Sequence, residues 1–241
     1  MSTITHFDSS AVDFLNEGAA VTGTVVDPAN AAVSLTLFAS VNGTVTATKL
    51  QKFNGQDSVK FAAAATNCSA ATAAATLISS YTKVVQACYY RPESMAFSAG
   101  DQHTIIYNST NFDVIVNHTG GIKARARVID GANAMVVQTA QSAVLNNNQW
   151  YRVVVIYTKI DATHGSVDLL IDDVLIGTSG SGVHTPPGAT LACRYGSAAA
   201  SGGSGTITAG VFYLDKVSFA SMNAVTDRPA DLAFPVQELS I

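Results

Sequence analysis

Hydrophobic and polar residues alternate along most of the chain, and clusters of turn residues separate the alternating runs. The segments 33–41, 43–53, 81–90 and 210–220 all show this pattern. Alternation places successive side chains on opposite faces of an extended backbone, which is typical of half-buried strands. A dozen or so short runs of this kind predict an all-β fold, a two-sheet antiparallel β-sandwich.

Turn signals divide these runs. Asn-Gly dipeptides at 42–43 and 54–55 predict two hairpins. The sequence Ser-Thr-Asn at 109–111 and the pair Gly120-Gly121 predict turns on either side of one strand. The pair Arg91-Pro92 predicts the end of the preceding strand, because proline cannot donate to a sheet ladder.

The chain shows no linker at which the composition changes. The Ala-rich segment 62–76 is interrupted by Thr, Asn and Ser, so we expect a loop or one short helix there. We therefore predict a single domain over residues 1–241. Its closing strand lies near 210–220, and a C-terminal tail spans 223–241.

Two adjacent aspartates, Asp172 and Asp173, interrupt the apolar stretch 146–178. They stand where a two-residue hairpin turn would fall. A type I′ turn needs positive φ at both positions, which Asp tolerates better than most residues. We therefore expect a surface turn that binds nothing, in preference to a catalytic or calcium-binding pair.

Four segments resemble, in order, the strands of one fold family: "LQKFNGQDSVKF", "YTKVVQACYYRPES", "NNQWYRVVVIYTKIDATHGSVDLLIDDVLIGT" and "VFYLDKVSF". The family is that of the laminin-G-like, concanavalin A-like jelly rolls, and the resemblance spans about residues 4–220. It implies a jelly-roll sandwich whose last strand returns beside the N-terminal one. Asp173 departs from the family pattern, which prefers Gly at that position.

The composition narrows the function classes. Charged residues make up 12% of the chain and hydrophobic residues 48%, against roughly 25% charged in typical soluble domains. A net charge of −4 argues against nucleic acid as a partner, and no apolar run reaches the roughly 18 residues of a membrane span. No targeting segment is visible at the start of the chain.

This low-charge composition resembles that of phage virion surface proteins. The leading interpretation is therefore a non-enzymatic, lectin-like virion protein, either a capsid-decoration or a fibre-associated protein. We expect it to assemble with other virion or surface proteins and to bind a carbohydrate or cell surface. The alternative is a secreted lectin, polysaccharide lyase or glycoside hydrolase, which would place the protein outside the cell.

The distribution of candidate catalytic residues argues against an enzyme. Retaining glycoside hydrolysis needs two carboxylates about 5–5.5 Å apart. On one strand Asp168 and Asp172 would stand about 13 Å apart, at about 3.3 Å per residue. A lyase pair could be formed by Tyr107 with His103 or His118, but no lyase motif surrounds these residues.

Three cations alternate in "IKARARV", so that Lys123, Arg125 and Arg127 share one strand face. One interpretation is a strip that binds an acidic polysaccharide. The other is a solvated sheet face, or an edge strand guarded by charge. Tyr89 and Tyr90 are further ligand candidates, since aromatic rings stack on sugars.

No cofactor is expected, apart from a structural calcium ion. The resemblance to carbohydrate-binding jelly rolls implies a calcium-binding Asp on the closing strand. Asp215 has that place, with Asp8 or Glu17 near the N-terminus as further ligands. Calcium takes six to eight oxygen ligands, so more than this set would be required.

Overall fold

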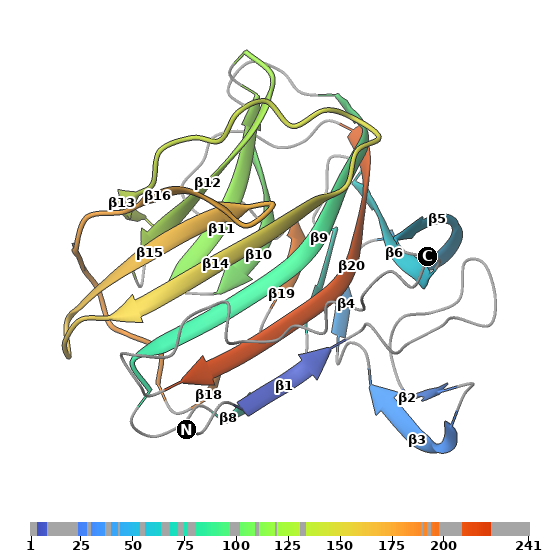
Figure 1. Ribbon diagram of the computed structural model, residues 1–241, viewed down its shortest axis with the longest axis horizontal. Helices are drawn as coiled ribbons and strands as arrows, with labels where there is room; N and C mark the ends of the chain where they lie inside the picture. Colours follow the sequence, from blue (N-terminus) through green and yellow to red (C-terminus); the bar gives the residue numbers. More distant parts are fainter. Residues whose placement is uncertain are drawn as a thin grey trace.

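The chain forms two antiparallel sheets that pack face to face (Figure 1). This computed structural model describes residues 4–8, 24–27, 30–36, 40–42, 44–53, 56–63, 68–71, 75–76, 81–96, 102–108, 111–118, 120–130, 134–188, 190–191, 194–197 and 209–222. The described residues form strands, turns and bends. They contain no helix that is long and apolar enough to cross a membrane. The predicted fold class, an all-β sandwich of two antiparallel sheets, is confirmed.

The first sheet has nine strands. Its main path is β16 (Val174–Thr178), β15 (His164–Ile171), β14 (Tyr151–Lys159), β9 (Lys83–Ala96), β20 (Ala209–Met222), β6 (Gln56–Ala63) and β5 (Thr44–Phe53). Two further strands pair with this path, β1 (Ile4–Asp8) with β20 and β17 (Gly182–Val183) with β15. The late strand β20 thus returns beside the N-terminal strand, as the resemblance implied; residues 223–241 lie outside the described part.

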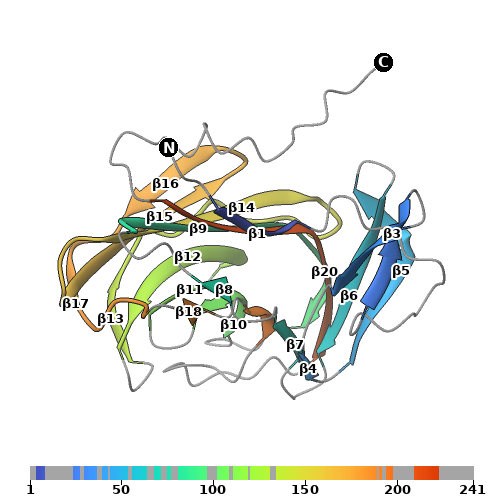
Figure 2. The same cartoon turned by 90° about the horizontal axis from the view of Figure 1, so that it is seen from below.

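The second sheet has seven strands. Their order is β13 (Met135–Gln138), β12 (Ile122–Ile129), β11 (Phe112–His118), β10 (Gln102–Asn108), β19 (Arg194–Ser197), β7 (Cys68–Ala71) and β4 (Ser40–Asn42). Two small pairs accompany the main sheets, β18 (Thr190–Leu191) with β8 (Ala75–Thr76) and β2 (Thr24–Asp27) with β3 (Asn30–Thr36). Seen edge-on, the two large sheets form two layers, and β6 and β5 turn down one side (Figure 2).

Strand β14 explains why the sheets pack as they do. Val153, Val155 and Tyr157 are completely buried in the main core between the sheets. The alternate residues Val154 and Ile156 belong to a second apolar cluster. Both faces of β14 are therefore apolar, as expected for a strand at the centre of a sheet.

Two of the expected turns form as hairpins. Phe53 pairs with Gln56 across Asn54-Gly55, so this dipeptide joins β5 to β6. Gly120 and Gly121 have φ angles of 71° and 116° and join β11 to β12. At Gly121 an added Cβ would lie 2.9 Å from the Val144 side chain, so only glycine fits.

The other Asn-Gly dipeptide was interpreted wrongly. Strands β4 and β5 flank residues 42–43, but β4 pairs with β7 in the seven-stranded sheet and β5 with β6 in the nine-stranded sheet. The chain therefore passes from one sheet to the other between β4 and β5. The expected loop or helix at 62–76 was also wrong, since residues 68–71 and 75–76 are strands.

Strand β9 continues to Ala96, past the end predicted at Pro92. Its pairing with β14 ends at Tyr90, so the missing N–H of Pro92 leaves no ladder bond to β14 broken. On the other side, β20 has a register shift between Val211 and Phe212, next to Pro92. A bulge is one of the few places where a sheet tolerates proline.

Hydroxyl side chains terminate one edge of each sheet in the same way. The N–H groups of Thr139, Ser142 and Ser179 donate to the carbonyls of Ala126, Ala124 and Val167 at 2.8–2.9 Å. In return, each hydroxyl oxygen accepts the N–H of that same partner at 2.9–3.1 Å. Hydroxyl oxygens thereby replace backbone acceptors at Thr139, Ser142 and Ser179.

Candidate functional site

The row Lys123, Arg125 and Arg127 lies on the outer face of the seven-stranded sheet. The intervening residues Ala124 and Ala126 are completely buried in the core, so the three cations point the opposite way. The predicted shared face is therefore confirmed. The three side chains differ, however, in what they meet on the neighbouring strand β11.

Arg127 does not present a free charge. It is 3% exposed and lies directly opposite Asp113, which is completely buried. Its Nε donates to Asp113 Oδ1 at 2.8 Å, and a terminal nitrogen donates to the other carboxylate oxygen at 2.5 Å. The expectation that Arg127 binds a ligand is corrected: this bidentate pair neutralises it inside the protein.

Arg125 is different because its partner on β11 is Ile115, an apolar residue. The guanidinium is half-buried, and among the described residues its buried Nε has no hydrogen-bond partner. Burial lowers the pKa of Arg125, Arg127 lowers it further, and Asp113 acts in the opposite direction. An anion placed here would supply the missing acceptor and offset both unfavourable effects.

Amide groups accompany the cations. Asn117 lies opposite Lys123, and Gln141 Nε2 donates to Asn117 Oδ1 at 3.4 Å. Lys123 is half-buried and has no ion pair within the described residues. Two amides, an ammonium and a guanidinium therefore stand together, a set that suits carboxylate, sulfate and hydroxyl groups.

The next strands carry an aromatic residue on the same outer face. Tyr107 pairs with Asp113 across β10 and β11, and Arg194 of β19 lies over its ring at 6.0 Å. Tyr107 is 6% exposed and packs against Ile129. The centre of this face is thus buried, and the exposed parts of Lys123 and Arg125 lie along its β12 side.

The lyase pair proposed between Tyr107 and His103 does not form. A register shift between Thr104 and Ile106 inserts one extra residue, so the two side chains lie on opposite faces of β10. His103 points into the core, where its Nε2 is 3.2 Å from the hydroxyl of Tyr90. Burial lowers the pKa of His103 to about 3, so its ring is neutral at pH 7.

Tyr89 and Tyr90 also separate. Tyr90 is completely buried, so the expectation that it stacks on a sugar is corrected: it is a core residue. Tyr89 is half-buried on the outer face of the nine-stranded sheet, opposite Arg152 and Asp215. Burial raises the pKa of its hydroxyl. Arg152 lowers this pKa, and Asp172 and Asp215 raise it.

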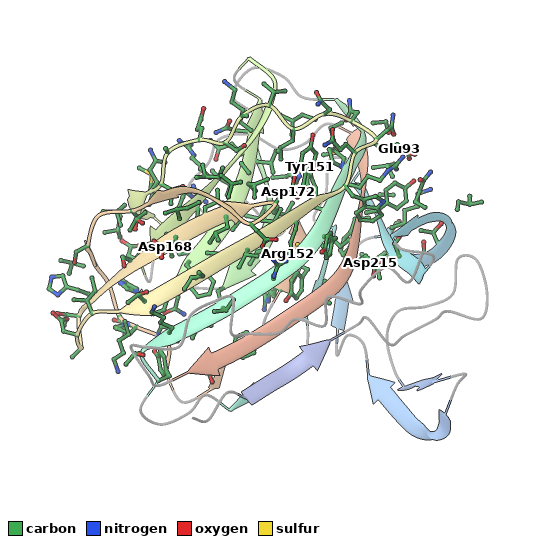
Figure 3. The ribbon with its side chains drawn as sticks, in the orientation of Figure 1. Glu93, Tyr151, Arg152, Asp168, Asp172 and Asp215 are labelled. Carbon is green, nitrogen blue, oxygen red and sulfur yellow. The ribbon has the colours of Figure 1, made fainter. Side chains whose placement is uncertain are left out.

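The aspartate pair forms the predicted turn. Asp172 and Asp173 have φ angles of 50° and 65°, as a type I′ turn requires, and join β15 to β16. Arg152 binds both aspartates. Its backbone N–H donates to Asp172 Oδ1 at 2.7 Å, and its guanidinium forms an ion pair with Asp173. Figure 3 shows Asp172 and Arg152 close together on this face.

A calcium site at the predicted ligands has no support in the described part of the chain. Asp215 is 4% exposed in β20, and its paired residue on β9 is Tyr89, which is not a carboxylate. Asp8 pairs with Ser218, beyond a register shift, and Glu17 lies outside the described residues. Where side chains are described, no three His, Cys, Asp or Glu residues gather as metal ligands.

Sequence comparison identifies no relatives: no family model matches the chain, and no curated protein matches it. Solved structures share its fold. An endo-β-1,4-glucuronan lyase from the fungus Trichoderma reesei is 12% identical with a TM-score of 0.53, covering 77% of this chain and 91% of its own. The alginate lyase Aly36B is 10% identical with a TM-score of 0.54, covering 90% and 96%.

A variant of Aly36B in complex with an alginate trisaccharide gives a similar match. It is 10% identical with a TM-score of 0.53, and the match covers 92% of this chain and 98% of that one. Since the two Aly36B matches span at least 90% of both chains, the similarity is one of the whole sandwich. At these identities it shows the fold alone.

The sequence did not identify Asp113, Asn117 and Gln141. Asp113 and Asn117 alternate in "FDVIVNH", two positions on either side of Ile115. That pattern was a signal that β11 carries polar groups on one face. Which of them meets which cation depends on the register of β11 and β12, which the sequence does not specify.

Proposed function

We propose that this protein is a non-catalytic, lectin-like β-sandwich that binds an acidic polysaccharide on the outer face of its seven-stranded sheet. The observation that carries the proposal is Arg125, whose buried Nε–H has no acceptor among the described residues. A buried donor without an acceptor costs about 1–3 kcal/mol, which a ligand oxygen would recover. Lys123 stands two positions away on the same face, with Asn117 opposite it and Gln141 bonded to Asn117.

The fold comparison supports a carbohydrate ligand. The neighbours with the higher TM-scores are named for glucuronan and for alginate, and one of them holds an alginate trisaccharide. The absence of catalysis is supported by the two Tyr–His hydrogen bonds among the described residues. Both Tyr90–His103 and Tyr157–His184 are buried in the sandwich, away from any polymer on its surface.

The test measures binding to alginate and polyglucuronate, with neutral glucan for comparison. The double variant Lys123→Ala/Arg125→Ala should lose about tenfold or more in affinity, since about 1.4 kcal/mol corresponds to tenfold. The matched control, Lys83→Ala/Lys159→Ala, removes the same charge from the nine-stranded sheet and should bind as the wild type does. Equal losses in both variants, or no binding of the wild type to either acidic polymer, would overturn the proposal.

A polysaccharide lyase is the rival function. Tyr107 favours it, because a tyrosine hydroxyl lies on the same outer face as the cations, beneath Arg194. Lyases leave unsaturated sugar ends that absorb ultraviolet light. Release of such ends from alginate or polyglucuronate by the wild type, and its loss in Tyr107→Phe, would replace the binding proposal with the lyase.

The location on a virion surface, with other virion proteins as partners, is a further proposal. It is supported by the charged fraction of 12% and by exposed apolar side chains such as Leu50 at 79% and Val174 at 63%. Multiple copies on one particle would raise weak glycan binding through avidity. Detection of the protein in purified particles tests the location, and a clean monomer in ultracentrifugation at high concentration would contradict assembly.

A further inference from the structure

A segment between the two sheets is held in place by a histidine. Residues 179–188, here called the strap, follow β16 and include β17, which pairs with β15 through only two residues. At Gly182 an added Cβ would lie 2.8–2.9 Å from Val136 and Val137 of β13, so the strap contacts the other sheet as well. Figure 2 shows β17 at the edge where β15 and β13 come together.

His184 is the buried anchor of the strap. It is 6% exposed, and its backbone N–H donates to the carbonyl of Thr163 at 3.0 Å. Its ring makes two hydrogen bonds: Nε2 is 2.9 Å from the hydroxyl of Tyr157, and Nδ1 is 3.3 Å from the carbonyl of Gly182. A carbonyl only accepts, so Nδ1 carries the proton and Nε2 accepts from Tyr157.

The neutral ring therefore fits its site better than the protonated ring does. Protonation would place a second N–H at Nε2, facing the O–H of Tyr157. Burial raises the pKa of Tyr157, so this hydroxyl keeps its proton. It could accept from a protonated Nε2 only by turning its own O–H away from the imidazole that accepts it, which would leave a buried O–H without that bond. The ring has little room to turn away, because an added Cβ on Gly165 would lie 2.5 Å from both His184 Cε1 and the Tyr157 hydroxyl.

The charged groups around His184 do not favour an imidazolium. Burial has the largest effect and lowers the pKa of His184; the Gly182 carbonyl raises it, and His164 on β15 lowers it. Asp161 is exposed, and its carboxylate is hydrogen-bonded to His164 and to the backbone N–H of Thr163. On the adjacent strands, Lys159 lies over the ring of Tyr81 at 5.2 Å, and Phe112 stacks on Tyr157.

The rest of the strap is held by few bonds. Ser179 exchanges two hydrogen bonds with Val167 at its start, and the Tyr81 hydroxyl donates to the Pro187 carbonyl at 2.6 Å near its end. Between these points Gly180, Ser181, Val183 and Thr185 are exposed. Segments with so few buried contacts open locally at a free energy well below that of global unfolding.

We propose that residues 179–188 form an acid-released strap: protonation of His184 breaks its bond to Tyr157, detaches the strap and opens the sandwich between β13 and β15. The pKa of His184 is lowered in the folded state, so its contribution is complete above the ordinary histidine pKa of about 6.5 and is lost as the pH falls below it. Among the side chains that the structure describes, the other buried histidine is His103; burial lowers its pKa to about 3, so it does not titrate in this range.

The test is hydrogen–deuterium exchange between pH 7 and pH 4.5, corrected for the intrinsic exchange rate. Peptides covering 179–188 should lose protection by about tenfold or more, while peptides from β9, β11 and β14 keep theirs. His184→Gln keeps a side chain that bonds to Tyr157 but does not titrate, so its strap protection should not change with pH. The matched control His164→Gln removes a half-buried histidine that lowers the pKa of His184, so it should keep the loss of strap protection, with the midpoint at a slightly higher pH.

Three results would overturn the proposal. One is strap protection that does not change with pH in the wild type, and another is the same pH dependence in His184→Gln. The third is loss of protection in the strap and the core strands together, which would indicate global unfolding. If His184→Gln does not fold, NMR titration of the His184 imidazole in the wild type provides the test. A pKa of His184 at or above about 6.5 contradicts the acid-released strap.

Discussion

The outer faces of the two sheets both carry arginines, but the two faces differ in whether those arginines are paired with carboxylates. On the nine-stranded sheet, Arg152 is engaged by the Asp172–Asp173 turn, and Arg91 pairs with Glu93 at 3.5 Å. On the seven-stranded sheet, Arg127 is paired with Asp113, but its neighbour Arg125 has no ion pair among the described residues. One face therefore satisfies its guanidinium groups internally, while the other leaves one for a ligand.

The difference arises from strand register. Arg125 and Arg127 are two positions apart on β12 and share a face, yet one lies opposite Ile115 and the other opposite Asp113. The same alternating pattern thus produces a buried ion pair and a partly desolvated cation side by side. Charge on a strand indicates a binding site only when the neighbouring strand leaves that charge unpaired.

The largest expected effect comes from breaking the internal pair. Asp113→Ala leaves Arg127 buried without its carboxylate and should lower the free energy of unfolding by about 3–5 kcal/mol. Asp173→Ala removes an exposed partner of Arg152 and should cost no more than about 1 kcal/mol. Urea unfolding at pH 7 measures both. Similar losses in the two variants would remove the distinction between the faces.

A second variant checks that the cost comes from the uncompensated charge. Asp113→Leu with Arg127→Met replaces the whole pair by apolar side chains of similar volume. Such replacements are often neutral or stabilising. The double variant should therefore be clearly more stable than Asp113→Ala, and a loss equal to that of the single variant would contradict the explanation.

The fold was predictable because it depends on periodicity. In β14 the alternation of Val153, Val155 and Tyr157 with Val154 and Ile156 indicated a central strand, and the structure confirms it. The Asp172–Asp173 turn was predictable for a similar local reason, since positive φ at two adjacent positions favours few residue types.

The site was less predictable, because it depends on contacts between strands. Tyr89 and Tyr90 are adjacent, yet one is on the outer face and the other is completely buried. Alternation requires that they separate, but it does not say which of them points inward. The bulge in β10 that separates His103 from Tyr107 left no mark in the sequence, since any residue can occupy the extra position.

Loss of an edge hydroxyl should destabilise both sheets to a similar extent, even though their outer faces differ. Ser142→Ala removes the acceptor of the Ala124 N–H at the edge of the seven-stranded sheet, and Ser179→Ala does the same for Val167 in the other sheet. Each should cost about 1–3 kcal/mol, because a buried N–H then lacks a partner. Thermal and urea unfolding measure the losses, and Ser166→Ala, on β15, is the control. A loss in only one of the two edge variants would show that the edges are not equivalent.

Single substitutions sharpen the comparison of the two arginines. Arg125→Gln should weaken binding to an acidic polysaccharide by about tenfold, since a hydrogen bond to a charged group is worth about 1.5–3 kcal/mol. Arg152→Gln removes the same charge from the other face and should change affinity less than twofold. Isothermal titration at low salt measures both. Stronger loss in Arg152→Gln would move the binding site to the nine-stranded sheet.

The smallest effect is expected at the turn. Asp173→Gly relieves the strain of a φ of 65° but removes an exposed ion pair with Arg152, worth about 0–1 kcal/mol. These effects oppose each other, so the stability should change by no more than about 0.5 kcal/mol, with glycan binding unchanged. Asp172→Gly differs, because Asp172 Oδ1 accepts the Arg152 N–H at 2.7 Å, and its loss should cost about 1 kcal/mol. Equal losses in the two glycine variants, measured by urea unfolding, would show that the ion pair of Asp173 matters as much as the backbone contact of Asp172. The nine-stranded face would then depend on its charges as strongly as the seven-stranded face does.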